Sequence, residues 1–416
     1  MAKAGRADCD VIIAGGGMVG LACALALAGR PGEGLAVQVL EAGTGGGGDI
    51  RASAITAASR RMLSQLGVWA ALEPKTQAVR QMMISDSRSS QAVRPPFLTF
   101  DALGLADGEA VVIVENRDVV AGLREAVENH PGVTLRQGVR VSGYSQHKGG
   151  VEVAIEGAGG GEGAETLRAR LLVAADGAKS RLREAAGIKC VEWEYGQWGI
   201  VATIGLARGH DATALQHFMP PGPFAMLPLP GNRASLVWTE KEASARALLA
   251  LGEDEFVAEI EQRLGRRFGA VSLAGPRGGF PLGLRIARAL VAPRLALIGD
   301  AAHRLHPLAG QGVNLGFRDG AALAETLLGA ARLGLDIGSP AVLEDYQRWR
   351  RFDTLAMAAA TDGLNRLFSN DLDAIRLVRD IGLGLVNRWS GLKDLLIREA
   401  AGDTGTLPRL LRGEPL

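Results

Sequence analysis

The 416-residue chain is poor in cysteine and has almost no excess charge of either sign. Its three cysteines, Cys9, Cys23 and Cys190, match neither a metal site nor a redox motif, so we expect core thiols of a reducing compartment and no bound metal. Lys and Arg total 46 against 45 Asp and Glu, without a basic cluster, which argues against a nucleic-acid partner.

Long apolar runs are also missing. None reaches the ~18 residues that a membrane span needs, and the first strand begins by Asp10 without a signal peptide ahead of it. We therefore expect a cytoplasmic protein. The chain is long enough, and at 47% hydrophobic residues apolar enough, to bury a large core. We expect two domains and an extension.

A glycine-rich loop near the start of the chain lies between a buried strand and an apolar helix. The strand is DVIIA (10–14), and the loop is GGGMVG (15–20). In a dinucleotide fingerprint, Gly15 makes the tight turn, Gly17 lets a pyrophosphate approach the helix N-terminus, and Gly20 allows close packing of helix and strand. The segment therefore predicts a dinucleotide site.

An acid follows the next predicted strand (36–40). Glu41 lies about 20 residues after the glycine-rich loop. At this place a carboxylate accepts hydrogen bonds from ribose hydroxyls and disfavours a 2′-phosphate. Two further matches to the glycine pattern, at 43–48 and 159–164, neither follow a strand nor open an apolar helix. We interpret both as loops.

The segment 295–319 combines an apolar strand, one acid and a turn rich in glycine and proline. The strand ends at Gly299 and Asp300, and a loop through Pro307 opens a long helix at about Gly312. Such a junction places a carboxylate beside free helix N-terminal amides. A ligand with ribose-like hydroxyls and an electron-rich ring edge fits there, and flavin is such a ligand.

The order of three motifs resembles the FAD-dependent aromatic monooxygenases of the para-hydroxybenzoate hydroxylase type. The motifs are GGGMVG (15–20), AADGAKSRLR (174–183) and GDAAH (299–303). Narrower matches resemble the ubiquinone-biosynthesis hydroxylases within that group. They are HPLAGQGVNLGFRD (306–319), YGQ (195–197), GPFAMLPL (222–229), FPLGL (280–284) and TDGLNRLFSND (361–371).

We expect an α/β protein with an interleaved Rossmann-like FAD-binding domain, a mostly antiparallel β-sheet substrate domain and a C-terminal helical extension. Strand follows strand in the predicted substrate domain, before one helix at 254–264. The predicted division is 1–75, 101–184 and 285–335 for FAD, 76–100 and 185–284 for the substrate, and 336–416 for the extension.

The resemblance implies a set of flavin contacts. Asp176 with Gly177 matches a conserved contact, although Asp176 alone could merely cap the following helix. Arg51 matches an arginine that lies beside the FAD phosphates in the family. Asn116 matches a polar contact to the flavin, and Val141 matches a backbone contact to the adenine. The predicted cofactor-binding residues are Gly15, Gly17, Met18, Val19, Gly20, Glu41, Arg51, Asn116, Val141, Asp176, Gly177, Gly299, Asp300, Pro307, Gly310, Gly312, Val313 and Asn314.

Side chains that act directly in the reaction are few. The resemblance places Pro307 at the flavin face, where it shields the reaction, and no acid or base is assigned. His303 and His306 lie on the same loop, and we expect them to position it rather than transfer protons. Their spacing is also poor for zinc without a third ligand.

The implied cofactor is one noncovalent FAD, with NADH or NADPH as a transient co-substrate, because only one convincing motif set is present. Reduced flavin supplies the electrons that let O2 attack an aromatic ring. The sheet could offer an apolar wall to a prenylated phenol, although the same residues could be ordinary core. These residues are Phe218, Met219, Pro220, Phe224, Met226 and Leu227.

The region 340–416 is predicted to be helical, with apolar residues at helical spacing that include Leu364, Leu367 and Phe368, and Leu392, Leu395 and Leu396. Its 11 Arg and Lys balance 11 Asp and Glu, so it lacks the basic face of a membrane-bound helix. We expect it to pack on the FAD-binding domain or a second subunit, and any membrane contact to be hydrophobic and local.

The resemblance implies an FAD- and NAD(P)H-dependent monooxygenase that hydroxylates the ring of a polyprenylated phenol in ubiquinone biosynthesis. The resemblance also suggests partners to consider: other proteins of that pathway, a second copy of the chain and the inner membrane surface. Two alternatives stay open. One is a flavin hydroxylase of a soluble aromatic compound, and the other is a flavin-bound structural subunit of a biosynthetic complex.

Overall fold

The structure is a computed structural model, and every structural statement below concerns the residues it describes. These are residues 7–44, 48–86, 98–101, 111–157, 165–307, 310, 312–368 and 402–416.

A six-stranded sheet carries the glycine-rich loop and the strand that leads to Asp300. Its neighbouring strands are parallel, apart from the antiparallel edge pair β18 and β19. All of β1 is buried and apolar, as a parallel strand covered on both faces should be. The order is β18 (Val291–Ala292), β19 (Leu295–Leu297), β12 (Leu171–Ala174), β1 (Val11–Ala14), β2 (Val37–Glu41) and β8 (Val133–Gln137).

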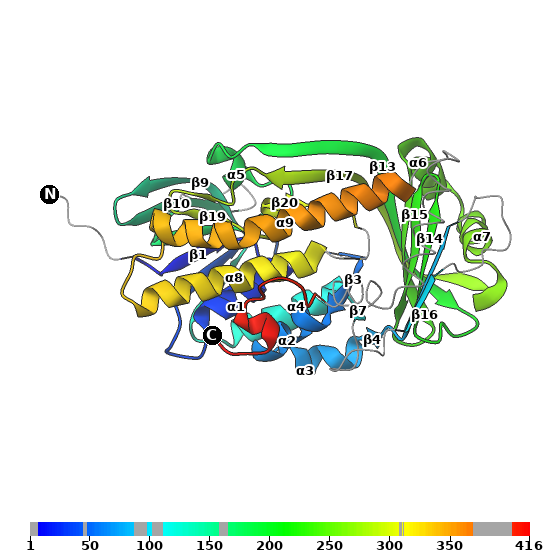
Figure 1. Ribbon diagram of the computed structural model, residues 1–416, viewed down its shortest axis with the longest axis horizontal. Helices are drawn as coiled ribbons and strands as arrows, with labels where there is room; N and C mark the ends of the chain where they lie inside the picture. The colour runs from blue at the N-terminus through cyan, green and yellow to red at the C-terminus, as the bar shows by residue number, and fades with distance from the viewer. Residues whose placement is uncertain are drawn as a thin grey trace.

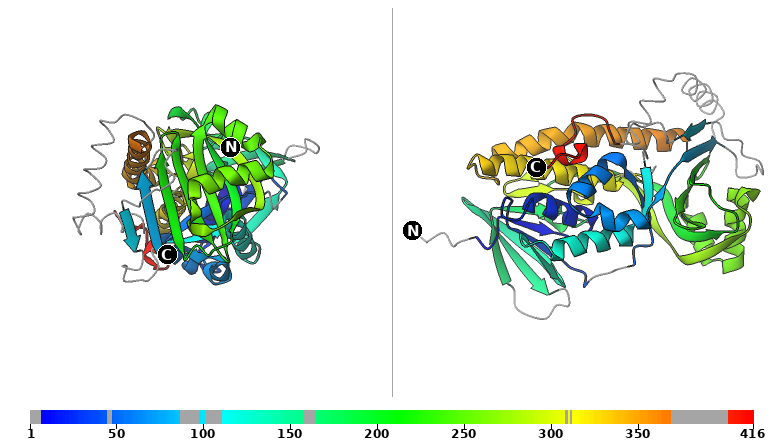
Figure 2. Two further views of the ribbon diagram at one scale, coloured as in Figure 1. Left: turned by 90° about the vertical axis from the view of Figure 1, so that its right-hand side faces the viewer. Right: turned by 90° about the horizontal axis from the view of Figure 1, so that it is seen from below.

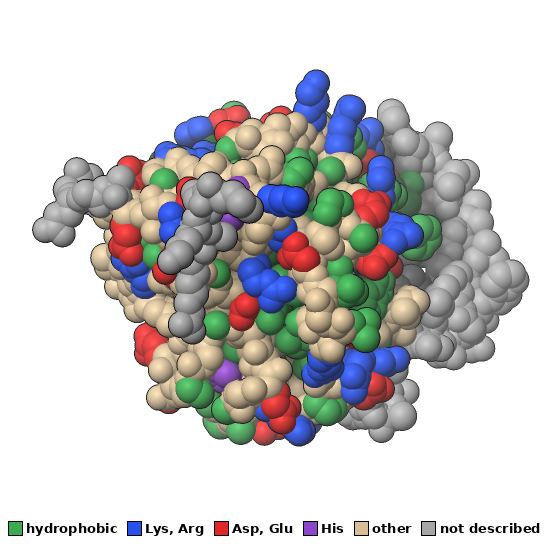
Figure 3. Space-filling view, turned by 90° about the vertical axis from the view of Figure 1, so that its left-hand side faces the viewer, with side chains coloured by type: hydrophobic (Ala, Val, Ile, Leu, Met, Phe, Trp, Pro, Cys, Tyr) green, Lys and Arg blue, Asp and Glu red, His purple; other side chains and the backbone are tan. Residues whose placement is uncertain are grey.

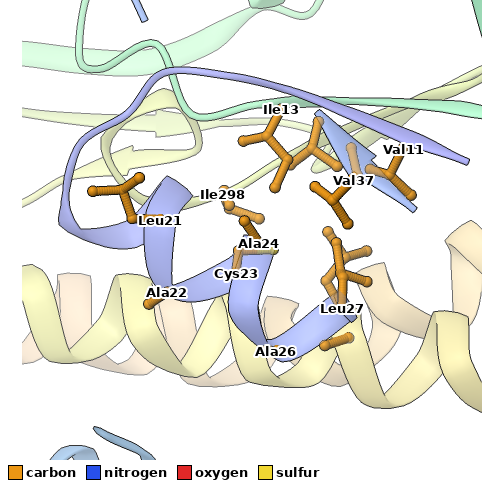
Figure 4. Packing of buried hydrophobic residues seen from close by; sticks show 14 of the residues in the cluster. Val11, Ile13, Leu21, Ala22, Cys23, Ala24, Ala26, Leu27, Val37 and Ile298 are labelled. Atoms are coloured by element: carbon orange, nitrogen blue, oxygen red, sulfur yellow. The ribbon is translucent and has the colours of Figure 1, made fainter. Parts of the chain in front are cut away.

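Small residues let two helices stack closely on this sheet. Helix α1 (Met18–Ala28) packs between the sheet and α8 (Gly312–Arg332), and Figure 4 shows its side chains beside those of β1 and β2. A Cβ added at Gly320 of α8 would lie 3.2 Å from the Cβ of Cys23. A larger residue at either position would therefore push the helices apart.

The second large sheet has eight strands. Neighbouring pairs are antiparallel, except that β14 and β5 are parallel. The two longest strands, β13 and β17, run from the six-stranded sheet to the far end of the molecule (Figure 1). The order is β20 (His303–Arg304), β17 (Val271–Ala287), β13 (Cys190–Leu206), β16 (Arg233–Lys241), β15 (Gly222–Leu229), β14 (Thr213–Met219), β5 (Gln81–Asp86) and β6 (Leu98–Asp101).

Two helices cover the outer face of the eight-stranded sheet: α6 (Glu242–Ala250) and α7 (Glu253–Leu264) (Figure 2). The prediction of a single helix here was wrong. Leu251 and Gly252 separate the two helices, and each helix has its own buried side chains, Ala245 in α6 and Phe256 in α7.

The remaining elements connect the sheets. Two small sheets and several short helices are described. They are β3 (Ala52–Thr56), β7 (Val111–Glu115) and β4 (Gln77–Ala78); β9 (Val139–His147), β10 (Gly150–Gly157) and β11 (Glu165–Ala169); and helices α2 (Ala57–Gln65), α3 (Trp69–Leu72), α4 (Asn116–Glu128) and α5 (Arg181–Ala185), with the 3-10 turns η1 (Glu73–Lys75), η2 (Arg266–Phe268) and η3 (Gly299–Ala301).

The C-terminal region contributes α9 (Pro340–Phe368) and the 3-10 turn η5 (Arg409–Arg412). Helix α9 packs along α8 and continues to the eight-stranded sheet (Figure 1). The buried hydroxyl of Tyr346 in α9 donates to the carbonyl of Leu297 at 2.8 Å. The predicted helical residues around Leu392 lie outside the described residues.

The mixed α/β architecture, with mixed and antiparallel sheets and C-terminal helices, confirms the predicted fold class. Among the described helices, none combines the length and apolar character required to span a membrane. On the end of the molecule shown in Figure 3, Lys and Arg side chains lie among Asp and Glu side chains.

Candidate functional site

A cavity of about 350 Å³ opens between the carboxyl ends of β1 and β12 and the inner face of the eight-stranded sheet. Such a position, beyond the carboxyl ends of parallel strands, is where open α/β sheets bind their ligands. The predicted residues that line it are Gly17, Met18, Val19, Gly20, Arg51, Asn116, Gly177, Asp300, Pro307, Gly310, Gly312 and Val313. Gly15, Glu41, Val141, Asp176, Gly299 and Asn314 are not among the lining residues.

The glycine-rich loop is shaped by three different constraints. Gly15 has a φ of +120°, and a Cβ there would lie 2.2 Å from the carbonyl oxygen of Ala175. A Cβ at Gly20 would meet the carbonyl oxygen of Gly15 at 2.0 Å, so α1 could not begin so close to β1 with any other residue. A Cβ at Gly17 would meet nothing within 4 Å, and the backbone there faces the cavity. The loop thus leaves room for a phosphate group beside α1.

Glu41 lies behind this loop. Its Oε2 accepts a hydrogen bond from the amide of Gly16 at 2.5 Å, and its Oε1 accepts one from the amide of Gly43 at 2.9 Å. The carboxylate therefore holds the glycine-rich loop in place, and a ribose contact would use its remaining lone pairs.

The second cofactor segment joins η3 to the start of α8. The carboxylate of Asp300 is exposed at the cavity wall, and α8 begins at Gly312, where the sequence predicts it. Asn314 holds this end of α8, because its side chain donates to the carbonyl of Ala54 at 2.8 Å and accepts from the amide of Thr56 at 3.2 Å. Free helix amides and a carboxylate thus face one cavity.

Arg51 and Asn116 are joined by Asp49, which the sequence analysis missed. Asp49 accepts from Nε and Nη2 of Arg51 at 2.8 and 2.7 Å, and from Nδ2 of Asn116 at 2.9 Å. Burial alone would raise the pKa of Asp49, but Arg51 and Asn116 outweigh it and hold the pKa below its ordinary value. A GGGGD run gives no periodic signal that would reveal this role.

Asp176 lies between two residues that line the cavity, Ala175 and Gly177. The cap of α5 is Ser180, whose hydroxyl accepts from the amide of Arg183, so Asp176 is not its N-cap. Its Oδ2 accepts from the amide of Leu182 at 3.3 Å, and its buried Oδ1 has no partner among the described residues. A buried acceptor without a partner costs free energy unless a ligand or water satisfies it.

Val141 lies in β9, away from the cavity, and its side chain packs against the main core. Arg304 lines the cavity and donates to the carbonyl of Pro281.

His303 forms a fully buried contact with Asp319, a residue for which the sequence predicted no role. Nε2 of His303 lies 2.6 Å from Oδ2 of Asp319, which also accepts from the amide of Gly299 at 3.0 Å. Nε of Arg350 donates to Oδ1 of Asp319 at 2.8 Å. Burial by itself raises the pKa of Asp319, but His303 and Arg350 outweigh it and hold the pKa low. The network therefore attaches two helices, α8 and α9, to the turn that contains Asp300.

His306 has a different environment. Its ring is buried, neither ring nitrogen has a partner among the described residues, and burial lowers its pKa to about 4. The ring meets Tyr195 edge to face, with 5.4 Å between the centroids. Since Pro307, the next residue, lines the cavity, this packing locates the turn at the cavity wall.

The far wall of the cavity belongs to the eight-stranded sheet. Side chains alternate along a strand, so Ala225 and Leu227 face the cavity while Phe224 and Met226 pack beneath α6 and α7. Of the apolar wall predicted from the sequence, only Leu227 lines the cavity. The wall residues from this sheet are Val201, Gln216, Ala225, Leu227, Val237, Phe280, Leu282 and Arg304.

The arrangement fits a flavin dinucleotide: a glycine cradle at the N-terminus of α1, a carboxylate and free amides at α8, and an apolar wall opposite. Among the described residues, no group of three or more His, Cys, Asp or Glu side chains could hold a metal ion.

Comparison with known proteins gives a consistent result. The family described as "FAD binding domain" matches residues 8–360. The chain is 44% identical to the ubiquinone hydroxylase UbiL of Rhodospirillum rubrum, over 99% of this chain and 95% of that protein. It is 37% identical to the 3-demethoxyubiquinol 3-hydroxylase of Escherichia coli, over 94% and 98% of the two chains.

Among solved structures, the p-nitrophenol 4-monooxygenase PnpA of Pseudomonas putida superposes with a TM-score of 0.79 at 22% identity, covering 95% of this chain and 96% of that one. At this level of identity the similarity establishes a shared fold.

Proposed function

The chain belongs to the FAD-dependent hydroxylases of ubiquinone biosynthesis, and we propose from this that it hydroxylates the aromatic ring of a polyprenylated phenol with NAD(P)H and O2. The proposal rests on one observation: the glycine-rich loop at Gly17, the turn at Asp300 and the mostly apolar sheet wall all line the same cavity. A cofactor and an apolar ring can meet there.

FAD bound in this cavity supplies the electrons that activate O2 toward the ring. We propose that the amides around Gly17 hold its pyrophosphate, that Asp300 accepts hydrogen bonds from its hydroxyl groups, and that the N-terminus of α8 stabilises negative charge on the reduced ring. Arg51 lines the same cavity, where Asp49 orients its guanidinium group, and we propose that it contacts the phosphates.

The protein's part in the reaction is to hold the substrate ring near the flavin and to exclude water. We propose that Pro307 covers the flavin face and that Leu227, Phe280 and Leu282 contact the phenol. Gln216 and Arg304 are the polar side chains on the sheet wall. A mostly apolar wall favours a prenylated phenol over a soluble aromatic compound.

The proposed function also implies a domain organisation for the chain. We propose that 1–75, 101–184 and 285–335 act as the FAD-binding domain, 76–100 and 185–284 as the substrate domain, and 336–416 as the extension. We further propose that the protein is cytoplasmic and works at the inner membrane surface, where the prenyl tail of such a substrate would lie, beside other ubiquinone-biosynthesis proteins or a second copy of itself.

Deletion of the gene tests the proposed function in the cell. The deletion strain should accumulate a prenylated precursor that lacks one ring oxygen, and the chain should restore ubiquinone in a strain that lacks one ring hydroxylase. Normal quinone in a deletion strain that has no second hydroxylase, together with failure to rescue any such strain, would contradict the proposal.

A further inference from the structure

Two of the narrower sequence motifs, YGQ (195–197) and TDGLNRLFSND (361–371), meet in the structure. The hydroxyl of Tyr195 donates to Oδ1 of Asp362 at 2.9 Å, and Nε1 of Trp193 donates to the same oxygen at 3.2 Å. These contacts join β13 of the eight-stranded sheet to the last turns of α9.

A β-bulge places Tyr195 in this position. The pairing of β13 with β17 shifts between Glu194 and Gln197, and Gly196 has a left-handed φ of +66°. A bulge turns a side chain away from the regular alternation of its strand. The YGQ motif therefore directs Tyr195 to α9, and its left-handed centre favours glycine.

Gln197 extends the same contact toward the cavity. Its Nε2 donates to the carbonyl of Pro221 at 2.7 Å, and its Oε1 accepts from Nδ2 of Asn365 at 3.2 Å. Gln197 is buried and pairs in register with Leu282, which lines the cavity. Because directly paired residues share a face of a sheet, Gln197 lies at the edge of the cavity wall.

Tyr195 also contacts the loop that carries Pro307. Its ring packs against that of His306, and Pro307 follows at the cavity wall. Burial and the hydrogen bond to Asp362 raise the pKa of Tyr195, so its hydroxyl stays protonated and keeps donating. One side chain thus touches α9, the sheet and the loop next to Pro307.

We propose that this set of contacts, the α9 seam, is a positioning device for the hydroxylation reaction. The seam consists of Trp193, Tyr195 and Gln197 on β13, and Asp362 and Asn365 on α9. It keeps the loop at Pro307 at a fixed distance from the sheet wall, so the substrate ring is held at the reacting face and water is kept out. The inference rests on the proposed function and assigns roles to residues of that same site.

The tests are Tyr195→Phe, which keeps the ring against His306, and Asp362→Ala. Both holoenzymes should release roughly three- to tenfold more hydrogen peroxide per hydroxylated product, the effect of losing one net hydrogen bond of ordinary strength. Their FAD content should not change. Asp362→Asn should recover part of the loss, because its amide oxygen can still accept from Tyr195. The double variant Tyr195→Phe with Asp362→Ala should be no worse than the more severe of the two single variants.

Asp345→Asn is the matched control, since Asp345 forms an exposed ion pair with Arg348 on the same helix. It should leave the peroxide ratio unchanged. An unchanged ratio in Tyr195→Phe and Asp362→Ala, or an equal rise in the control, would overturn the proposal.

Hydrogen exchange of peptides that cover residues 303–307 separates this inference from the proposed function, because it needs no turnover. Exchange should be faster in Tyr195→Phe than in the wild type and the Asp345→Asn control. If the wild type makes no hydroxylated product, the proposed function fails while the exchange result still tests the seam. Equal exchange in all three proteins would contradict the seam.

Discussion

Nε2 of His303 lies 2.6 Å from Oδ2 of Asp319, and both side chains are fully buried. The same carboxylate accepts from the amide of Gly299, one residue before Asp300, and its other oxygen accepts from Arg350 of α9. One buried charge therefore connects the predicted cofactor turn to two helices.

Asp319→Ala should destabilise the protein by about 3–5 kcal/mol, because it removes the buried carboxylate shared by His303 and Arg350 and leaves Arg350 with Asp353 as its remaining acid partner among the described residues. Urea denaturation measures the loss, with the exposed Asp345→Ala as a control. The same variant should also bind FAD more weakly, since the turn before Asp300 loses its anchor. A loss below about 1 kcal/mol would show that the network does not hold the fold.

Asp300→Ala should weaken FAD binding by roughly 10- to 100-fold, the equivalent of one charge-assisted hydrogen bond worth ~1.5–3 kcal/mol. The carboxylate is exposed, so the unfolding free energy of the apoprotein should change little. Fluorescence titration of the apoprotein with FAD gives the affinity. Unchanged affinity would mean that Asp300 is not a flavin contact.

Pro307→Gly should uncouple the reaction. If the turn shields the flavin, the variant should still oxidise NAD(P)H but release more hydrogen peroxide for each product formed. A peroxide assay beside product chromatography gives the ratio. An equal loss of both activities, with the ratio preserved, would count against shielding.

The buried ring of His306 should make stability depend on pH. Burial lowers the pKa of His306 to about 4 from an ordinary value of 6.5, although the negative charge of Asp362 acts to raise it. The neighbouring Tyr195 stays neutral. Between these two values the unfolded state binds a proton that the folded state excludes, so stability falls as pH falls. Relative to His306→Gln, the wild type should lose about 1.4 kcal/mol per pH unit below 6.5.

Denaturation of both proteins at pH 7.5, 6.5 and 5.5 checks this dependence. The two stabilities should run parallel above pH 6.5, where His306 is neutral in both states, and diverge at pH 5.5. Parallel curves over the whole range would show that His306 is not kept neutral by the fold.

Local patterns predicted much of the cofactor half of the molecule. The strand before Gly15, the start of α8 at Gly312 and the strand before Asp300 follow from short-range signals of apolar runs, glycine and proline. The same signals could not predict that Leu227 lines the cavity while Phe224 packs beneath the helices. The alternation along β15 shows that the strand has two different faces, but not which face meets α6 and α7.

Contacts across long sequence separations were not predictable. Asp319 stands within a motif that the sequence analysis singled out, but its partner Arg350 lies 31 residues away on another helix. Tyr195 and Asp362 are 167 residues apart, and only the bulge at Gly196 brings them together. A polar residue on an amphipathic helix gives no signal of which element it will meet.

The most direct test of the account uses the purified holoenzyme with NAD(P)H, a short-tailed prenyl phenol and ¹⁸O2. The account predicts a hydroxylated phenol that carries one ¹⁸O atom on the ring, detected by mass spectrometry. Oxidation of NAD(P)H that yields only labelled hydrogen peroxide, or a product whose new oxygen comes from water, would contradict it.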